Sequence, residues 1–180
     1  MDKKRETDGP LRIEYVDLAA LVRWPRNPKQ HDLGTLHQSF KRFGYVAPIL
    51  VDEGTGKIVA GHGRLDALQQ AQASGEPPPE RIQAKNGRWF VPVVRGLDFA
   101  SELDAEAYLI ADNQLTVLGG WDDNALAEVL KDLAAQEALD GIGFDREDVD
   151  ALLRQVDGVP KEESSKGAVT CPQCNHEFIP

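Results

Sequence analysis

A small α+β fold followed by acidic helices is expected for this chain, on three observations. In the first half, short apolar runs typical of strands alternate with amphipathic helical segments. The 180 residues, 41% hydrophobic and 28% charged, suit one globular domain with tails. The charge is uneven: residues 1–64 hold 11 Lys and Arg against 8 Asp and Glu, while the remainder holds 9 against 22. We therefore expect an anionic ligand to bind the first half.

The composition argues against several classes of protein. No apolar run reaches the roughly 20 residues that span a bilayer. The charged start MDKKRETDGP has no apolar stretch of the kind found in a secretory signal. Both cysteines lie in the last ten residues, so no disulfide framework supports the core. These features predict a cytoplasmic protein without membrane contact.

The elements follow from local patterns taken in chain order. Four segments have the apolar or alternating pattern of strands: residues 11–18, 47–53, 57–60 and 89–96. Five positions begin helical periodicity: Asp32, the GHGR run, Ser101, Asp122 or Asp123, and Asp145. We expect the helix that Ser101 opens to end at Asn113. The expected organisation is a flexible N-terminus (1–10), a mixed α/β domain (11–113), an acidic helical extension (114–156), a polar linker (157–169) and a cysteine tail (170–180).

The run KIVAGHGRLDAL carries the strongest chemical signal. A strand ends, two glycines flank His62, and Arg64 opens a helix. Glycine permits positive φ and close approach of the backbone, and unpaired N–H groups at a helix start bind anions. Arg64 adds a planar group that suits phosphate oxygens. The alternative is a structural strand–helix turn in which Arg64 is solvated or paired with Asp66.

The order of motifs resembles the ParB N-terminal (ParB/sulfiredoxin-like) domain family. The resemblance covers about residues 11–135 and rests on several blocks in sequence: NP, FGY, PILVD, KIVAGHGRLDAL, WFVPVV, EAYLIADNQL and GWDDNALAEVL. The subgroup that it is most similar to occurs in phage proteins and beside DNA methyltransferases. The resemblance implies a fold with a small mixed sheet and helices. It also implies a nucleotide and DNA as partners, together with a methyltransferase or another mobile-element protein.

The resemblance implies where a nucleotide would bind. The G-E-R-R-like turn that binds nucleotide phosphates in the family falls on Gly61, His62, Gly63 and Arg64. Arg64 corresponds to its second arginine, and His62 and Gly63 replace the Glu and the first Arg, which favours phosphate binding over hydrolysis. A proline loop that faces the nucleotide is matched loosely by Arg26 and the Asn-Pro that follows it. Sulfiredoxin chemistry is not expected, because no cysteine lies near this turn.

A magnesium site is implied by a second block. The family's helix end E-N-L-Q-R is similar to IADNQL, which places Asp112 and Asn113 on its Glu-Asn pair. A carboxylate and an amide oxygen suit Mg²⁺. A polar helix end is the alternative interpretation. His31 and His37 are expected at the surface or on a helix face.

The tail TCPQCNHEF suggests zinc. Cys171 and Cys174 have the C-x2-C spacing in which two thiolates hold one side of a tetrahedral zinc ion, and His176 is a candidate third ligand. Sharing of one ion by two chains would complete the site and make a homodimer. Reduced thiols in a free tail are the alternative.

Three functions follow from these patterns. The first is a phosphate- or nucleotide-binding module linked to DNA metabolism, with weak NTPase activity if it is an enzyme. It would lack its own DNA-reading domain, because residues 98–157 hold 16 Asp and Glu against 3 Lys and Arg. The second is a metal-dependent nuclease, with His62 as general base and Asp112 as metal ligand. The third is an adaptor whose acidic helices bind a basic protein.

Overall fold

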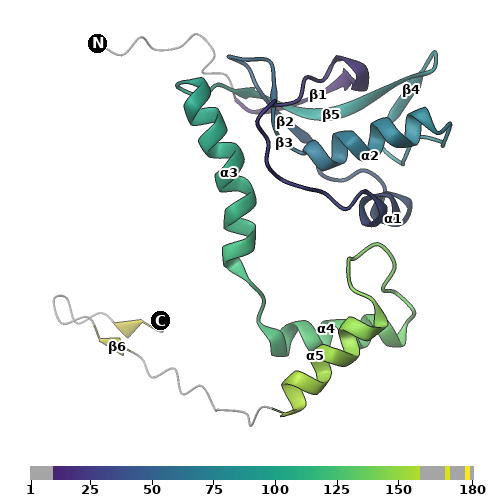
Figure 1. Cartoon of the computed structure of the whole chain (residues 1–180), viewed down its shortest axis with the longest axis vertical. Coiled ribbons are helices and arrows are strands. Elements are labelled where there is room, and N and C mark those ends of the chain that lie inside the picture. Colours follow the sequence, from purple (N-terminus) through teal and green to yellow (C-terminus); the bar gives the residue numbers. More distant parts are fainter. Residues whose placement is uncertain (1–9, 159–168, 171–176, 179–180) are drawn as a thin grey trace.

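The structure is a computed structural model that describes residues 10–158, 169–170 and 177–178 (Figure 1). Its elements are β1 (Arg12–Asp17), a short 3-10 helix (Leu18–Ala20), α1 (Leu33–Phe43), β2 (Ile49–Asp52), β3 (Ile58–Ala60), α2 (His62–Ala73), β4 (Gln83–Lys85), β5 (Arg88–Leu97), α3 (Glu102–Gly119), α4 (Asp123–Ala135), α5 (Arg146–Gly158), β6 (Val169–Thr170) and β7 (Glu177–Phe178).

One mixed sheet holds the first five strands. Its order is β1-β5-β2-β3, and β4 also pairs with β5. Strand β5 runs antiparallel to β1 and parallel to β2, while β2 and β3 form an antiparallel pair. Helices cover both faces of this sheet, so the expected α+β class is confirmed. The short strands β6 and β7 pair separately with each other.

The turn between β2 and β3 is fixed by a buried carboxylate. Asp52 is 2% exposed and accepts hydrogen bonds from the backbone N and Oγ1 of Thr55, at 2.9 and 2.6 Å. Its other oxygen accepts from the N–H of Phe99 at 3.1 Å. Burial of a charge is costly unless hydrogen bonds compensate, and these three bonds supply that compensation. Asp52 therefore joins the turn to the chain that enters α3.

The core lies on both faces of the sheet because successive strand residues point in opposite directions. On one face, Ile58 packs with Leu65 and Leu68 of α2, and all three are fully buried. On the other face, Val59 packs with Leu109 of α3. Strand β3, at the end of the sheet order but buried on both faces, therefore leads directly into α2.

Helices α4 and α5 form a pair with its own small core, which includes Leu130 and Val149. Figure 1 shows α3 leading away from the sheet to this pair. The loop between α4 and α5 returns to α1, where Nη1 of Arg42 donates to the carbonyls of Ala138 and Asp140 at 2.8 and 2.7 Å. One arginine thus links the acidic pair to the first domain.

Most helix starts agree with the sequence. Asp32, Ser101 and Asp122 each cap a helix through the side chain, as expected for these residue types. The expected end of α3 at Asn113 is wrong: the helix continues to Gly119, because residues 114–118 contain no helix breaker. The expected boundary between residues 113 and 114 therefore falls inside α3. No helix in the described part is long and apolar enough to cross a membrane.

Candidate functional site

The GHGR run forms the junction between β3 and α2. Gly61 is the N-cap of α2 and has φ 96°, a left-handed conformation that favours glycine. A Cβ atom at this position would lie 3.0 Å from Nη2 of Arg64 and 3.0 Å from Cγ1 of Ile49. Glycine is thus required by both conformation and space. The helix begins at His62, so Arg64 belongs to its first turn rather than opening it.

The first turn of α2 presents free backbone donors. Leu65 N donates to the carbonyl of Gly61 at 3.0 Å, which is the first bond of the helix. The N–H groups of His62, Gly63 and Arg64 donate to no residue in the described part of the chain, as is usual at a helix start without a side-chain cap. These three donors and the helix dipole favour an anion at this place.

Arg64 is held beside this turn without a carboxylate. Its Nη2 donates to the carbonyl of Pro48 at 3.1 Å, while its Nε is buried and has no partner in the described residues. The hydroxyl of Tyr45 is buried beside Arg64. Burial raises the pKa of Tyr45 to about 12, against the charge of Arg64 and a hydrogen bond from its side chain. Asp66, the alternative partner considered for Arg64, pairs with Arg23 instead.

His62 lies inside the protein. It is 3% exposed, and its Nε2 accepts a hydrogen bond from the N–H of Trp24 at 3.2 Å. Burial, together with the charge of Arg23, lowers the pKa of His62 to about 4. The imidazole is therefore neutral at neutral pH, with one nitrogen engaged by the loop that precedes α1. In this arrangement His62 joins that loop to α2.

His31, expected at the surface or on a helix face, is half-buried in the loop that precedes α1. Its Cγ lies 2.6 Å from the place where a Cβ of Gly63 would be, so the imidazole rests directly on the first turn of α2. Its Nε2 is buried and has no partner among the described residues. His37, in contrast, contacts Gln70 through Nε2 at the surface, 3.1 Å away.

The proline loop meets α3 at a small cavity of about 200 Å³. Its lining comes from the loop residues Asn27, Pro28 and Lys29 and from the α3 residues Ile110, Asn113, Gln114 and Val117. The structure thus brings Asn113 to the proline loop. It places Arg26 elsewhere, in an ion pair with Glu106 at 3.2 Å, and the Arg26 side chain is 80% exposed.

Asp112 and Asn113 follow each other on α3 and have different neighbours. Neighbouring residues on an α-helix project about 100° apart, and Asn113 lines the cavity while Asp112 does not. Asp112 stands beside Tyr108 instead: burial raises the pKa of Tyr108, and the Asp112 charge adds to the rise. A magnesium ion shared by this pair stays a prediction. Within the described residues no group of three or more His, Cys, Asp or Glu is suited to a metal. Cys171, Cys174 and His176 lie outside the described residues.

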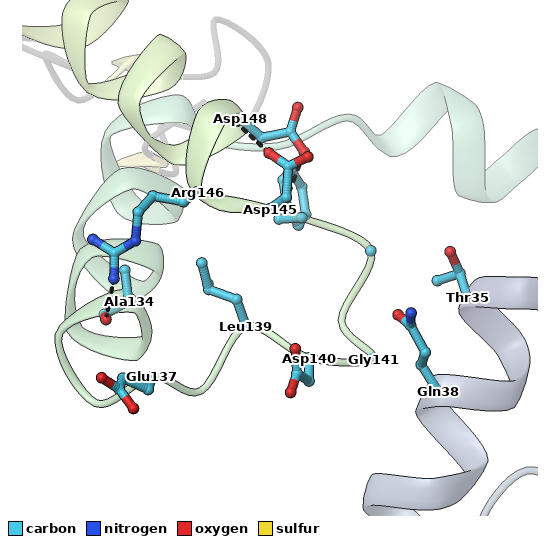
Figure 2. Close-up of a pocket in the computed structure, with 12 residues that line it drawn as sticks. Thr35, Gln38, Ala134, Glu137, Leu139, Asp140, Gly141, Asp145, Arg146 and Asp148 are labelled. Atoms are coloured by element: carbon cyan, nitrogen blue, oxygen red, sulfur yellow. Dashed lines mark hydrogen bonds between the residues drawn. The ribbon is translucent and has the colours of Figure 1, made fainter.

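A cavity of about 630 Å³ lies away from this turn, between α1 and the α4–α5 loop (Figure 2). Three of its charged side chains have local partners. Asp145 and Asp148 exchange backbone-to-carboxylate bonds of 2.9 and 3.0 Å that cap α5, and Arg146 donates to the carbonyl of Ala134 at 3.0 Å. These contacts give the residues a structural role at the start of α5.

Comparison with known proteins defines the class. No protein-family model matches the chain. Over 70 residues it is 36% identical to the ParB-like nuclease domain-containing protein YnaK of Escherichia coli (strain K12), and the aligned part covers 37% of this chain and 79% of YnaK. The chain therefore belongs to the family of ParB-like nuclease domain proteins.

A solved structure supports the same fold. The crystal structure of the C-terminally truncated chromosome-partitioning protein ParB from Caulobacter crescentus, complexed with CTP-gamma-S, is similar with a TM-score of 0.53 and 24% sequence identity. The similarity covers 86% of this chain and 82% of that chain. The expected ParB-like fold is confirmed.

Sequence reasoning missed several residues around α2. The sequence did not indicate that Lys29, His31 or Tyr45 belongs to the site. His31 and Tyr45 have buried polar atoms beside the first turn of α2, and the charge of Lys29 acts on His31. Only the NP motif near Lys29 gave a signal, since the contacts of His31 and Tyr45 join residues far apart in the sequence.

Proposed function

We propose that this protein is a phosphate- and nucleotide-binding module that acts in DNA metabolism in the cytoplasm. The observation that carries the proposal is the start of α2. The backbone N–H groups of His62, Gly63 and Arg64 have no partner in the described chain. The guanidinium of Arg64 lies beside them, has no carboxylate partner among the described residues and keeps its Nε unpaired. Buried donors rarely remain unpaired in a native state. An anion with several oxygens would satisfy them together.

The proposed ligand is a nucleoside triphosphate. The ParB of Caulobacter crescentus was crystallised with CTP-gamma-S, which supports CTP as the first nucleotide to test. In our proposal Gly61, His62, Gly63 and Arg64 hold the phosphates, and Asn113 faces the ligand from the cavity with the proline loop. Magnesium would bind together with the phosphates, and Asp112 and Asn113 are the residues proposed to help hold it.

Calorimetry tests the proposal. The full chain is titrated with CTP, ATP and GTP, each with Mg²⁺, and we expect one of them to bind. The variant Arg64→Ala should lose at least about tenfold in affinity, since a charge-assisted hydrogen bond contributes about 1.5–3 kcal/mol. Arg154→Ala, on α5, removes the same charge from an exposed position and should bind as the wild type does. Equal binding by Arg64→Ala, or none by the wild type, would refute the proposal.

Nuclease activity is the second candidate, and the name of YnaK supports it. A general base at His62 would first have to release the hydrogen bond from Trp24. Incubation with plasmid and single-stranded DNA plus Mg²⁺ or Mn²⁺ tests this candidate. Cleavage that persists in both His62→Ala and Asp112→Ala would count against these residues as its catalytic centre.

The proposal also includes two protein partners, a DNA-modifying protein and a second copy of this chain. We propose a phage or mobile-element setting in which the module works with a DNA methyltransferase or a similar protein, and in which the acidic helices α4 and α5 face that partner rather than DNA. A homodimer is proposed through zinc bound at Cys171 and Cys174. Pull-down with residues 98–157 in low and high salt tests the protein contact, since ion pairs at an interface weaken as salt rises.

A further inference from the structure

Gly63, the second glycine of the GHGR run, leaves room for the imidazole of His31, which comes from the loop before α1. With a Cβ at Gly63, Cγ of His31 would be 2.6 Å away and Nδ1 2.8 Å away, which is closer than such contacts can be. Gly63 has no positive φ, so its backbone alone does not require glycine. The absence of a side chain at this position therefore serves to let the imidazole rest on the first turn of α2.

Three buried polar atoms near this helix start have no well-aligned hydrogen-bond partner among the described residues. They are Nε2 of His31, Nε of Arg64 and the hydroxyl of Tyr45. Two of these atoms belong together, because the Tyr45 hydroxyl lies against the Arg64 side chain, whose charge and hydrogen bond both act on the pKa of Tyr45. Nε2 of His31 is therefore the buried nitrogen of this group that stands without a partner among the described residues, and a polar ligand at this turn would supply one.

The charges that face His31 are mainly positive. Lys29 and Arg23 approach from its own loop, and Arg64 approaches from α2. Burial and these three cations lower the pKa of His31, so the ring is neutral in the free protein at neutral pH.

The other titratable neighbours do not oppose this effect. His62 on α2 is neutral at neutral pH, Asp66 on α2 is paired with Arg23, and Asp32 caps α1 through Thr35. No described carboxylate is thus placed to hold a proton on His31. A bound anion would reverse the balance of charge around the ring.

We propose that His31 is a further phosphate-contacting residue of this site and that its imidazole takes up one proton when a polyphosphate anion binds. This inference rests on the proposed function, because it concerns the same site. The proton comes from water or buffer, the neutral imidazole becomes imidazolium, and the ring then donates a charge-assisted hydrogen bond to a phosphate oxygen. The protein would bind the anion more tightly as pH falls from 8 towards 6.

The test uses the full chain and inorganic tripolyphosphate as the probe. Calorimetry at pH 7 in two buffers of different ionisation enthalpy gives the number of protons taken up on binding. We expect net uptake by the wild type, loss of this uptake in His31→Gln, and affinity about tenfold weaker in that variant, the value of one charge-assisted bond. His37→Gln removes an exposed histidine from α1 and should keep both properties of the wild type.

Two further measurements keep the test valid if His31→Gln does not fold. Gly63→Ala keeps the imidazole but displaces it, and should also lose the proton uptake. Ring signals of His31 in NMR spectra of the wild type report its pKa directly, and we expect that pKa to rise when tripolyphosphate binds.

Failure of the His31 inference can be distinguished from failure of the proposed phosphate binding. If His31→Gln binds as the wild type does with the same proton uptake, or if the His31 pKa does not rise, the inference is wrong and phosphate binding stands. If the wild type does not bind tripolyphosphate, or Arg64→Ala binds it equally well, both the inference and the proposed function are wrong.

Discussion

Replacement of Gly63 by alanine gives the sharpest test of how the loop and α2 fit together. The added Cβ would meet three atoms of His31, Cγ, Nδ1 and Cβ, at 2.6, 2.8 and 3.0 Å. His31 cannot yield easily, because its Nε2 is buried and the loop is anchored next to it by the hydrogen bond from Trp24 to His62. We therefore expect the loop or the helix to shift.

The expected size of the effect follows from two opposing terms. Overpacking of a tight contact costs about 1–3 kcal/mol, while alanine in place of glycine in a helix gains about 1 kcal/mol or less. Gly119, in the last turn of α3, has nothing within 4 Å of its Cβ position and serves as the matched control. Urea denaturation should show Gly63→Ala less stable than Gly119→Ala by about 1–3 kcal/mol. Equal or greater stability of Gly63→Ala would refute the packing of His31 on this turn.

Three other outcomes are expected. Because the folded state lowers the pKa of His62 to about 4, the stability that this group contributes is full above about pH 6.5 and falls as pH drops towards 4. Denaturation at several pH values should show a slope of at most about 1.4 kcal/mol per pH unit, smaller in His62→Asn. Arg42→Ala removes both bonds to the α4–α5 loop, so limited proteolysis should cut residues 136–145 faster than in Lys41→Ala. Metal analysis of the purified chain should find zinc, and Cys171→Ser should lose it; equal zinc in both would contradict the proposed tail site.

Local signals made much of the fold predictable. The caps at Asp32, Ser101 and Asp122 depend on residues within one turn, and the strand pattern of residues 49–52 and 58–60 depends on apolar character that the sequence shows directly. Strand β4 was not predictable, because its three exposed residues pair only where β5 passes beside them. Its stability comes from a neighbour rather than from composition.

Some features of the candidate site could likewise be predicted from local sequence, and others could not. A left-handed glycine before a helix could be predicted at Gly61 from the strand–glycine–helix order alone. The reason for Gly63 could not, since it lies in His31, more than thirty residues earlier in the chain. Likewise the acceptor role of His62 depends on the backbone of Trp24, which no motif in the GHGR run indicates.

The central claim is that the first turn of α2 binds phosphate through its backbone donors. Amide signals of His62, Gly63 and Arg64 in a two-dimensional NMR spectrum report this most directly during titration with CTP and Mg²⁺. We expect the largest shifts in the spectrum to fall on these three amides and to saturate with ligand. Shifts confined to the cavity between α1 and α5, or no shift at these amides at saturating nucleotide, would contradict this claim.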